Sequence, residues 1–533
     1  MKKLWILLIV LVILGGCKPS VTTDPYPFEE EDLSFTYYPK TVMNEEKHLF
    51  VFGYEDGRRL NTHELITGQA IQGLFARDEV RFYLSTQEQQ LEYWLSEMVT
   101  VDHITYDRIT LSQMLAMYKQ KFSDHGYILY DKDNRESVNV ATSLSGILGY
   151  IPIEISLEHI AIAASLELKL DVKERSERWA FDTYKSLFNW SSVIQLRQDI
   201  PHMRDYGIAM KYFFFYQDAL TSSAINFRDD IHRMIPYDSP IFGWGPFAED
   251  SHIGIASRNG HFTIPSDYSF NTTVFSAIDF FNVKTIEPNH ISDYKAPENN
   301  KHYVTIIRSD GDNIQTWYNY FPFNVKDMGA VRGQFPMGWS IQPSLIDLAP
   351  NIIRDAYTKK DVNDYFVAAV SGHGYMYPTL YPDLKSFVQR LDIYLRRTGL
   401  NLVQILDSGP DEDVIEWYSR IPSLKGAMYM YGNKYAGGLG SIRWSDNGKP
   451  FVSFRESLWD SSPIDIAGRI NGYDRNYQDI KGYTLINLHP WSHSYQDVEQ
   501  MVALLGDHVV VLSPETFFDY IINYVPKVDV ILA

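Results

Sequence analysis

The sequence predicts a mixed α/β protein with two parts, a smaller N-terminal α/β domain and a larger, irregular (β/α) barrel resembling a TIM barrel. Strand-like and helix-like segments alternate along the chain, which is typical of α/β proteins. The 533 residues are enough for about two to four domains. After Tyr206 the strand-like segments change in character, because short β-branched or aromatic runs repeatedly end in a charged or polar residue beside glycine or proline.

The first 17 residues have the pattern of a bacterial lipoprotein signal peptide. Lys2 and Lys3 precede the unbroken apolar run Leu4–Leu14, and two glycines stand directly before Cys17, the only cysteine in the chain. The apolar run is shorter than the roughly 20 residues that a membrane-spanning helix needs. We therefore expect an exported bacterial protein that is held at the cell membrane or the outer membrane by a lipid on Cys17. An uncleaved signal anchor is the alternative.

Residues 18–33 are expected to form a tether, and residues 34–199 the N-terminal α/β domain. The tether contains three prolines and the acidic run Glu29–Asp32. In the N-terminal domain the small residues of Asn139–Gly149 predict a loop. Strands are expected at Leu49–Phe52, Val80–Tyr83 and Tyr127–Leu129, and helices at Glu64–Arg77, Glu88–Val99, Ser112–Phe122, Leu157–Leu168 and Glu177–Phe188.

Residues 200–533 are expected to form the barrel. In a parallel barrel the loops that follow the strands open on one face, where catalytic groups from distant parts of the chain converge. A doubly wound open sheet would give a similar pattern. The strands are expected at Ile208–Phe215, Pro240–Phe242, Tyr303–Arg308, Tyr365–Val370, Leu402–Leu406, Ala427–Tyr431, Phe451–Phe454, Tyr483–Leu488 and Val509–Leu512.

Charge and composition exclude some partners and favour another. The net charge of −19 argues against nucleic acids, and no cluster of lysine and arginine follows Lys3. Polyanionic substrates are disfavoured for the same reason. Aromatic residues make up 14% of the chain, and many stand beside glycine, proline or asparagine. Neutral sugars bind to such rings, which offer a flat apolar face and a polar edge, so a carbohydrate is the expected partner.

Carboxylates at two predicted strand ends are the candidate catalytic groups. Asp310 and Asp312 flank Gly311, whose flexibility would let both side chains face the mouth of the barrel. Glu456 follows a separate strand and stands beside Arg455. Hydrolysis of a glycosidic bond needs two carboxylates that flank the bond, and we expect Glu456 to pair with Asp310 or Asp312. Alternatively, the aspartates cap the next helix, and Glu456 forms an ion pair or contacts a helix N-terminus.

Two histidines allow a different interpretation. His489 and His493 could combine with the two aspartates in a metal site resembling those of metal-dependent sugar deacetylases. Pro490 argues against a regular helix through this pair, and in that family the histidines follow the aspartates closely. We therefore expect neither a metal nor another cofactor.

The most specific stretch is Gly372-His373-Gly374-Tyr375-Met376-Tyr377-Pro378. Its two glycines permit a tight turn after a buried strand, so that His373, Tyr375 and Tyr377 could project into the mouth of the barrel. Alternatively, the tyrosines pack against the helix that follows Pro382.

This stretch matches the G-x-G-Y-x-Y-P signature of a bacterial family that is named after it and described as glycoside hydrolases. Other segments also resemble the family, namely Gly243-Trp244-Gly245-Pro246 with Glu249 nearby, Ser309–Asn313, and Val138–Ser143 of the associated N-terminal domain. The resemblance covers most of the chain and implies cleavage of a sugar.

The resulting hypothesis is a surface glycoside hydrolase. Asp310, Asp312 and Glu456 supply the catalytic carboxylates, and the sugar is bound by Trp244, Glu249, His373, Tyr375, Tyr377, Asp407, His489 and Trp491. The alternatives are a noncatalytic glycan-binding lipoprotein and a metal-dependent deacetylase.

Overall fold

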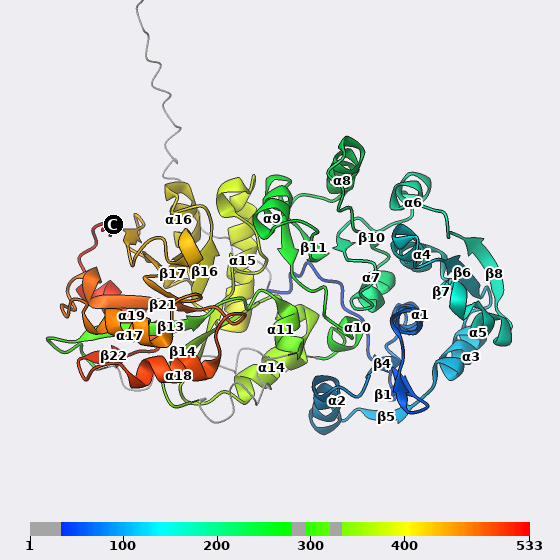
Figure 1. Cartoon of the computed structure of the whole chain (residues 1–533), viewed down its shortest axis with the longest axis horizontal. Helices are drawn as coiled ribbons and strands as arrows, with labels where there is room; N and C mark the ends of the chain where they lie inside the picture. Colours follow the sequence, from blue (N-terminus) through cyan, green and yellow to red (C-terminus); the bar gives the residue numbers. More distant parts are fainter. Residues whose placement is uncertain (1–32, 280–294, 320–332, 533) are drawn as a thin grey trace, which may run out of the picture.

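The computed structural model describes residues 33–279, 295–319 and 333–532 (Figure 1). The predicted signal peptide, Cys17 and almost all of the predicted tether lie outside these residues. Within the described ranges, no helix has the length and apolar character that crossing a membrane requires.

The N-terminal half of the chain contains three small parallel sheets. The first has the order β4-β1-β5, with β1 at His48–Phe52, β4 at Phe82–Leu84 and β5 at Thr105–Arg108. The second has the order β7-β6-β8, formed by Gly126–Tyr130 (β6), Ile151–Glu154 (β7) and Glu167–Asp171 (β8). The third has the order β10-β9-β11-β12, formed by Val193–Gln195 (β9), Phe213–Phe215 (β10), Ser239–Gly243 (β11) and His261–Ile264 (β12). The domain boundary expected after residue 199 falls between β9 and β10 of this third sheet.

Helices cover these sheets. They are α1 (Thr62–Phe75), α2 (Gln89–Val101), α3 (Leu111–Lys121), α4 (Arg135–Leu148), α5 (Glu158–Ala163), α6 (Glu177–Tyr184), α7 (Arg204–Ala209), α8 (Ser222–Met234), α9 (Glu249–Arg258) and α10 (Thr272–Phe275). Helix α1 begins with a capping box. The Asn61 side chain accepts a hydrogen bond from the Glu64 N–H, and the Glu64 carboxylate accepts one from the Asn61 N–H.

Three predicted elements in this half were wrong. Residues 139–149 are helical up to Leu148 and not a loop, because the small side chains of α4 pack against α7 and β10. Ser143 shows this contact, since its hydroxyl accepts a hydrogen bond from the Phe214 backbone N–H. The predicted helix 157–168 ends at Ala163 and is followed by β8, and the predicted strand 208–215 is the end of α7 followed by β10.

The C-terminal half contains one large curled sheet with the order β18-β19-β17-β16-β15-β14-β13-β21-β20, and β22 also pairs with β13. All pairs are parallel except β18 with β19. The strands are β13 (His302–Arg308), β14 (Met337–Ile341), β15 (Asp364–Ala368), β16 (Leu402–Leu406), β17 (Gly426–Met430), β18 (Ile442–Trp444), β19 (Pro450–Ser453), β20 (Glu456–Leu458), β21 (Tyr483–Leu488) and β22 (Val509–Val511).

The expected α/β class is confirmed, whereas a TIM barrel is not. Strand β20 is the last strand of the pairing order and β19 is the second, although only Phe454 and Arg455 separate these two strands in sequence. Within the described part of the chain no ladder joins these two strands, so the sheet is curled and predominantly parallel without a complete ring of paired strands.

The described helices of the C-terminal half are α11 (Ile314–Asn319), α13 (Leu345–Leu348), α14 (Pro350–Thr358), α15 (Leu384–Thr398), α16 (Glu412–Ser419), α17 (Pro463–Asn471), α18 (Tyr495–Ala503) and α19 (Pro514–Tyr524).

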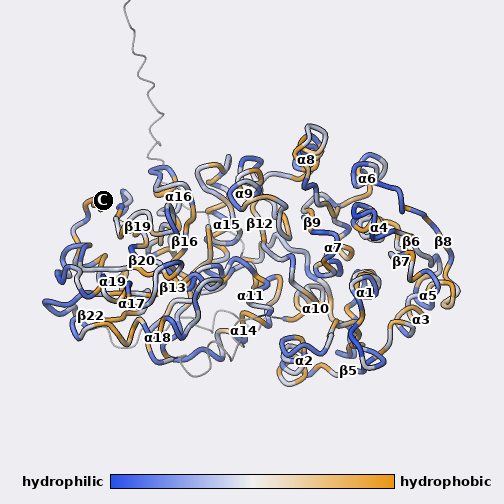
Figure 2. Tube along the Cα trace, in the orientation of Figure 1, coloured by the Kyte–Doolittle hydropathy of each residue, from blue (hydrophilic) through white to orange (hydrophobic). Residues whose placement is uncertain are grey.

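The two halves share a continuous apolar core. One cluster of contacting buried side chains includes Leu49 of β1, Phe242 of β11 and Trp339 of β14. Polar and apolar segments alternate along the described parts of the trace (Figure 2). A buried ion pair adds to the contact, because Arg354 of α14 binds the carboxylates of Glu97 and Asp102 in the N-terminal half. The third small sheet also contacts the large sheet's loops, since Thr263 of β12 forms a backbone bridge with Tyr375.

Candidate active site

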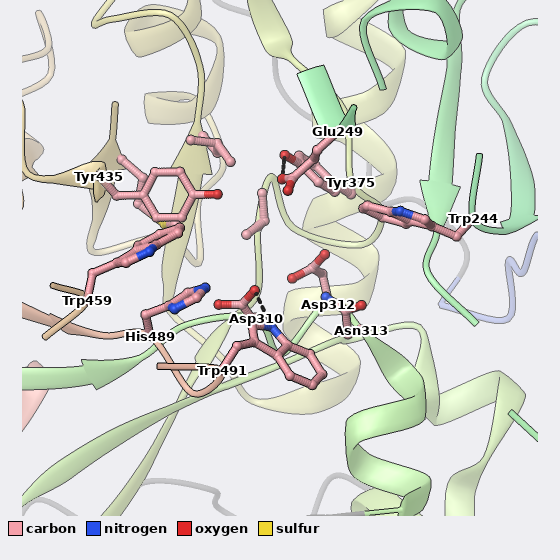
Figure 3. Close-up of a pocket in the computed structure, with 13 residues that line it drawn as sticks. Trp244, Glu249, Asp310, Asp312, Asn313, Tyr375, Tyr435, Trp459, His489 and Trp491 are labelled. Carbon is pink, nitrogen blue, oxygen red and sulfur yellow. Dashed lines mark hydrogen bonds between the residues drawn. The ribbon is translucent and has the colours of Figure 1, made fainter. Parts of the chain in front are cut away.

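A cavity of about 280 Å³ lies where the carboxyl ends of the large sheet meet the loop between β11 and α9. Its lining residues stand at the ends of strands or in the loops that follow them, as expected for the functional end of a parallel sheet. Figure 3 shows the lining, which consists of Trp244, Glu249, Asp310, Asp312, Asn313, Val370, Tyr375, Leu406, Met430, Tyr435, Trp459, His489 and Trp491.

The aspartate pair depends on Gly311. A Cβ atom at this position would lie 1.8 Å from the carbonyl oxygen of Ser340 on β14, so only glycine fits. The Gly311 N–H donates a hydrogen bond of 2.8 Å to the Ser340 hydroxyl and fixes the turn to the neighbouring strand. Asp310 has φ +64°, a left-handed conformation that is uncommon for a residue other than glycine and often found at functional sites. Both carboxylates therefore line the cavity, as the sequence predicts.

The two aspartates have different surroundings. The Asp310 carboxylate accepts hydrogen bonds from the Trp491 indole N–H (3.1 Å) and the Ser309 hydroxyl, which orient it. Asp312 is only 2% exposed. Burial raises the pKa of Asp312 well above its ordinary value, and the nearby charges of Asp310 and Glu249 raise it further. Asp312 is therefore the carboxyl group of this pair that holds its proton more firmly than an aspartate in water.

Glu249, the first residue of α9, is a third carboxylate in the cavity. It accepts a hydrogen bond of 2.5 Å from the Tyr375 hydroxyl and keeps contact with solvent. Its pKa is raised above the ordinary value because the surrounding protein desolvates the carboxylate, and the charge of Asp310 acts in the same direction. The hydrogen bond from Tyr375 opposes this shift by stabilising the ionised form.

The G-x-G-Y-x-Y-P stretch brings Tyr375 to Glu249. Gly372 has φ +108°, which permits the sharp turn after β15. A Cβ atom on Gly374 would lie 2.0 Å from the ring of Phe262, so this glycine lets the loop approach β12 closely. Tyr375 then exchanges two backbone hydrogen bonds with Thr263 of β12, of 2.8 and 2.9 Å. The loop thus joins the large sheet to β12 of the third small sheet.

Aromatic rings form the rest of the wall. The rings of Trp459 and His489 are stacked with centroids 3.6 Å apart and planes 5° apart, and Tyr435 meets Trp459 edge-on at 5.1 Å. Burial lowers the pKa of His489, and the neighbouring Asp310 opposes this shift. Trp491 and Trp244 line the cavity at two other positions (Figure 3). Flat rings beside carboxylates are well suited to a sugar.

The placement of Glu456 differs from the prediction. This residue does not line the cavity, and its carboxylate binds Arg469 of α17 at 2.7 Å and accepts a hydrogen bond from the Tyr473 hydroxyl. Successive side chains of a strand point to opposite faces, so the position of Glu456 at the start of β20 directs it to the side of α17. Glu249, which was expected only to bind the sugar, is the carboxylate that faces the aspartates.

His373 also differs from the prediction, because it is buried and does not reach the cavity. Its ring stacks on Phe387 with centroids 4.0 Å apart and lies beside Tyr37 and Tyr394 at 5.4 and 5.3 Å. Burial lowers the pKa of His373 well below its ordinary value, so the ring is neutral. His373 is therefore a core residue of this loop and not a cavity residue.

Tyr377 and Asp407 line a neighbouring cavity of about 530 Å³. The carboxylate of Asp407 accepts hydrogen bonds from the Thr379 N–H (2.9 Å) and the Thr379 hydroxyl (2.6 Å), which fix the segment after the loop. Burial raises the pKa of Asp407. This cavity shares Glu249, Leu406 and Tyr435 with the first one.

The two histidines considered for a metal site have separate contacts. His489 interacts with the Ser492 hydroxyl at 2.7 Å, whereas His493 lies 3.3 Å from Asp497 of α18. Among the residues that the structure describes, no group of three or more His, Cys, Asp or Glu side chains could hold a metal ion.

Six lining residues were not among the predicted site residues: the polar or aromatic Asn313, Tyr435 and Trp459, and the apolar Val370, Leu406 and Met430. Trp459 follows β20 directly, so the rule that residues after strands face the site would have selected it instead of Glu456. Tyr435 stands in the loop after β17, and its left-handed conformation (φ +64°) is not visible in the sequence.

Comparison with known proteins agrees with this geometry. Carboxylates and aromatic rings lie together at the carboxyl end of a parallel sheet, which is where the active sites of parallel α/β barrels are built. Three family models match the chain in order: the GxGYxYP_N second domain (residues 125–188), the GxGYxYP third domain (residues 191–277) and the "GxGYxYP putative glycoside hydrolase C-terminal domain" (residues 300–521). The chain belongs to the GxGYxYP family.

A solved structure is similar over nearly the whole chain. It is described as a "putative hydrolase" from Bacteroides thetaiotaomicron VPI-5482 and is 28% identical, with a TM-score of 0.85 over 94% of this chain and 98% of that chain. No curated protein matches the chain.

Proposed function

We propose that this protein is a glycoside hydrolase in which Glu249 donates a proton to the glycosidic oxygen and Asp310 is the opposing carboxylate. The observation that carries the proposal is the arrangement of these groups on different walls of one aromatic-lined cavity (Figure 3). Retaining and inverting glycosidases both need two carboxyl groups that flank the scissile bond. Membership in the GxGYxYP family supports the same reaction class.

Glu249 is suited to the role of general acid. Its raised pKa keeps the proton on the carboxyl group at a higher pH than for a glutamate in water, and its contact with solvent gives access to a leaving group. After the transfer, the hydrogen bond from Tyr375 stabilises the carboxylate that forms. Asp312 also has a raised pKa, but at 2% exposure its carboxyl group is much less accessible to a leaving group than that of the exposed Glu249. We assign Asp312 a hydrogen bond to a sugar hydroxyl.

Asp310 is suited to stabilise the positive charge that develops on the sugar ring during cleavage. The indole of Trp491 and the hydroxyl of Ser309 hold its carboxylate in one orientation. The stacked rings of Trp459 and His489 offer a flat surface to the sugar beside it.

The test is the release of reducing ends from a panel of neutral and host-type glycans by the protein without residues 1–17. We expect the variants Glu249→Gln and Asp310→Asn to lose about 100- to 10,000-fold in turnover, as removal of a general acid or a catalytic carboxylate does. Glu456→Gln is the matched control, since it changes a carboxylate of the same sheet that does not line the cavity. Saturable binding of a glycan without cleavage would contradict the proposal and indicate a glycan-binding protein.

We further propose that the protein is exported and anchored by a lipid on Cys17. The support is the sequence pattern of residues 1–17. Metabolic labelling with a radioactive fatty acid should mark the wild type in the membrane fraction and leave Cys17→Ser unlabelled. Labelling of the variant would contradict the anchor.

A further inference from the structure

A second cavity lies beside the proposed active site on the side of the N-terminal half. Its volume is about 500 Å³, within the range of small-molecule sites. The residues that line it come from several separate segments, among them Arg59 near α1, Tyr268 after β12 and Gln315 of α11. Trp491 lines this cavity and the active-site cavity, so the two adjoin at the indole.

The cavity that contains Tyr377 and Asp407 adjoins the active site at other residues. It shares Glu249, Leu406 and Tyr435 with the active-site cavity and does not include Trp491. In Figure 3, Trp491 and Tyr435 lie on different sides of Asp310. The three cavities therefore follow one another, and the carboxylates line the middle one.

The second cavity has the surface of a sugar-binding site. Tyr268 and Trp491 are 42% and 56% exposed, so two large rings of the cavity lining are open to solvent. The loop that carries Tyr268 is fixed by α11, because Gln315 accepts a hydrogen bond from the Tyr268 N–H (3.2 Å) and Asn319 donates one to its carbonyl oxygen (3.3 Å). Fixed rings with amide groups nearby are suited to stacking and hydrogen bonding with a sugar.

The charges of this cavity favour a neutral ligand. Arg59 is bound to the carboxylate of Glu88, which also lines the cavity. The guanidinium group is therefore compensated and does not favour an anionic sugar. The overall charge of −19 acts in the same direction.

We propose that the second cavity is a sugar-binding subsite of the same enzyme, and that the substrate is a neutral oligosaccharide or polysaccharide cleaved at an internal bond. This inference rests on the proposed glycosidase function. One part of the chain would occupy the second cavity, the scissile bond would lie between Glu249 and Asp310, and the rest would extend toward Tyr377. A sugar stacked on Trp491 would contact the residue that orients Asp310, which links occupancy of the subsite to catalysis.

The experiment compares Tyr268→Ala with the wild type on labelled neutral oligosaccharides from disaccharides to octasaccharides. We expect kcat/KM on the longest substrates to fall about tenfold, the effect of one lost stacking contact, with little change on disaccharides, which cannot span the cavities. The wild type should release internal fragments early in the reaction. Tyr106→Ala is the matched control, because Tyr106 is 39% exposed and lines none of the three cavities.

Two results would overturn the inference. One is an equal loss on short and long substrates, and the other is the release of single terminal sugars alone. Calorimetric binding of the same oligosaccharides to Glu249→Gln separates this inference from the proposed function. One outcome is that longer oligosaccharides bind more tightly, that adding Tyr268→Ala weakens this binding, and that the wild type cleaves none of them. This outcome would refute the proposed glycosidase activity and support the sugar-binding subsite. Binding that does not depend on length or on Tyr268 would refute the subsite.

Discussion

Replacement of Gly311 by alanine tests the geometry of the aspartate pair, and its effect on stability can be measured without knowledge of the substrate. The added Cβ would lie 1.8, 2.2 and 2.5 Å from the carbonyl oxygen, carbonyl carbon and hydroxyl oxygen of Ser340. Two of these atoms belong to the backbone of β14, so a change of rotamer cannot relieve the contact. To reach a distance of about 3 Å, the turn or the strand must move by roughly 1 Å.

The expected cost has two parts. Overpacking against a fixed backbone costs about 1–3 kcal/mol. Loss of the hydrogen bond from the Gly311 N–H to Ser340 adds about 1 kcal/mol. We therefore expect the free energy of unfolding to fall by about 2–4 kcal/mol. A displacement of about 1 Å at catalytic groups also lowers turnover by about 100-fold.

Chemical denaturation of Gly311→Ala and turnover on a cleaved glycan measure both effects. Gly468→Ala is the control, because this exposed glycine of α17 has no atom within 4 Å of an added Cβ. Alanine should leave the stability of the helix unchanged or raise it by about 0.5–1 kcal/mol. Wild-type stability and turnover in Gly311→Ala would refute the reasoning, since the turn would then tolerate a side chain.

Three further predictions concern single side chains. Glu456→Gln should lower the free energy of unfolding by about 1–2 kcal/mol, because it weakens the bond to Arg469, and turnover should be retained. A loss of turnover in a stably folded variant would instead mean that Glu456 takes part in catalysis. Tyr375→Phe removes the donor that lowers the pKa of Glu249, so the alkaline limb of the pH–rate profile should move to higher pH, and a shift to lower pH would contradict this assignment. Because the pKa of Asp312 is raised in the folded protein, the folded state keeps this proton at pH values where the unfolded chain has already released it. The free energy of unfolding therefore falls as the pH rises above about 4, the ordinary pKa of an aspartate. Asp312→Asn should therefore raise Tm at about pH 7, with the gain shrinking toward pH 4, and an equal effect at both values would exclude the titration of this carboxyl.

Local sequence patterns were sufficient for the α/β class and for part of the site. The alternation of elements, the Asp-Gly-Asp turn after β13 and the G-x-G-Y-x-Y-P loop after β15 depend on residues close together in the chain. Asp310, Asp312 and Tyr375 consequently line the cavity as predicted. The same local reasoning was wrong for Asn139–Gly149, because the helical state of these small polar residues depends on their burial against other elements.

The choice of the second carboxylate depended on the tertiary structure. Glu249 and Glu456 both stand near strand ends in sequence, and the sequence does not tell which of them faces the aspartates. The pleat of β20 directs Glu456 toward Arg469, while the contact between Tyr375 and Thr263 joins the third small sheet, whose strands β11 and β12 flank α9 in the chain, to the large sheet. Local patterns thus determined which residues could take part in chemistry. Packing between segments far apart in the chain decided which of them meet, because the direction of a side chain is set by register and by the surfaces that enclose it.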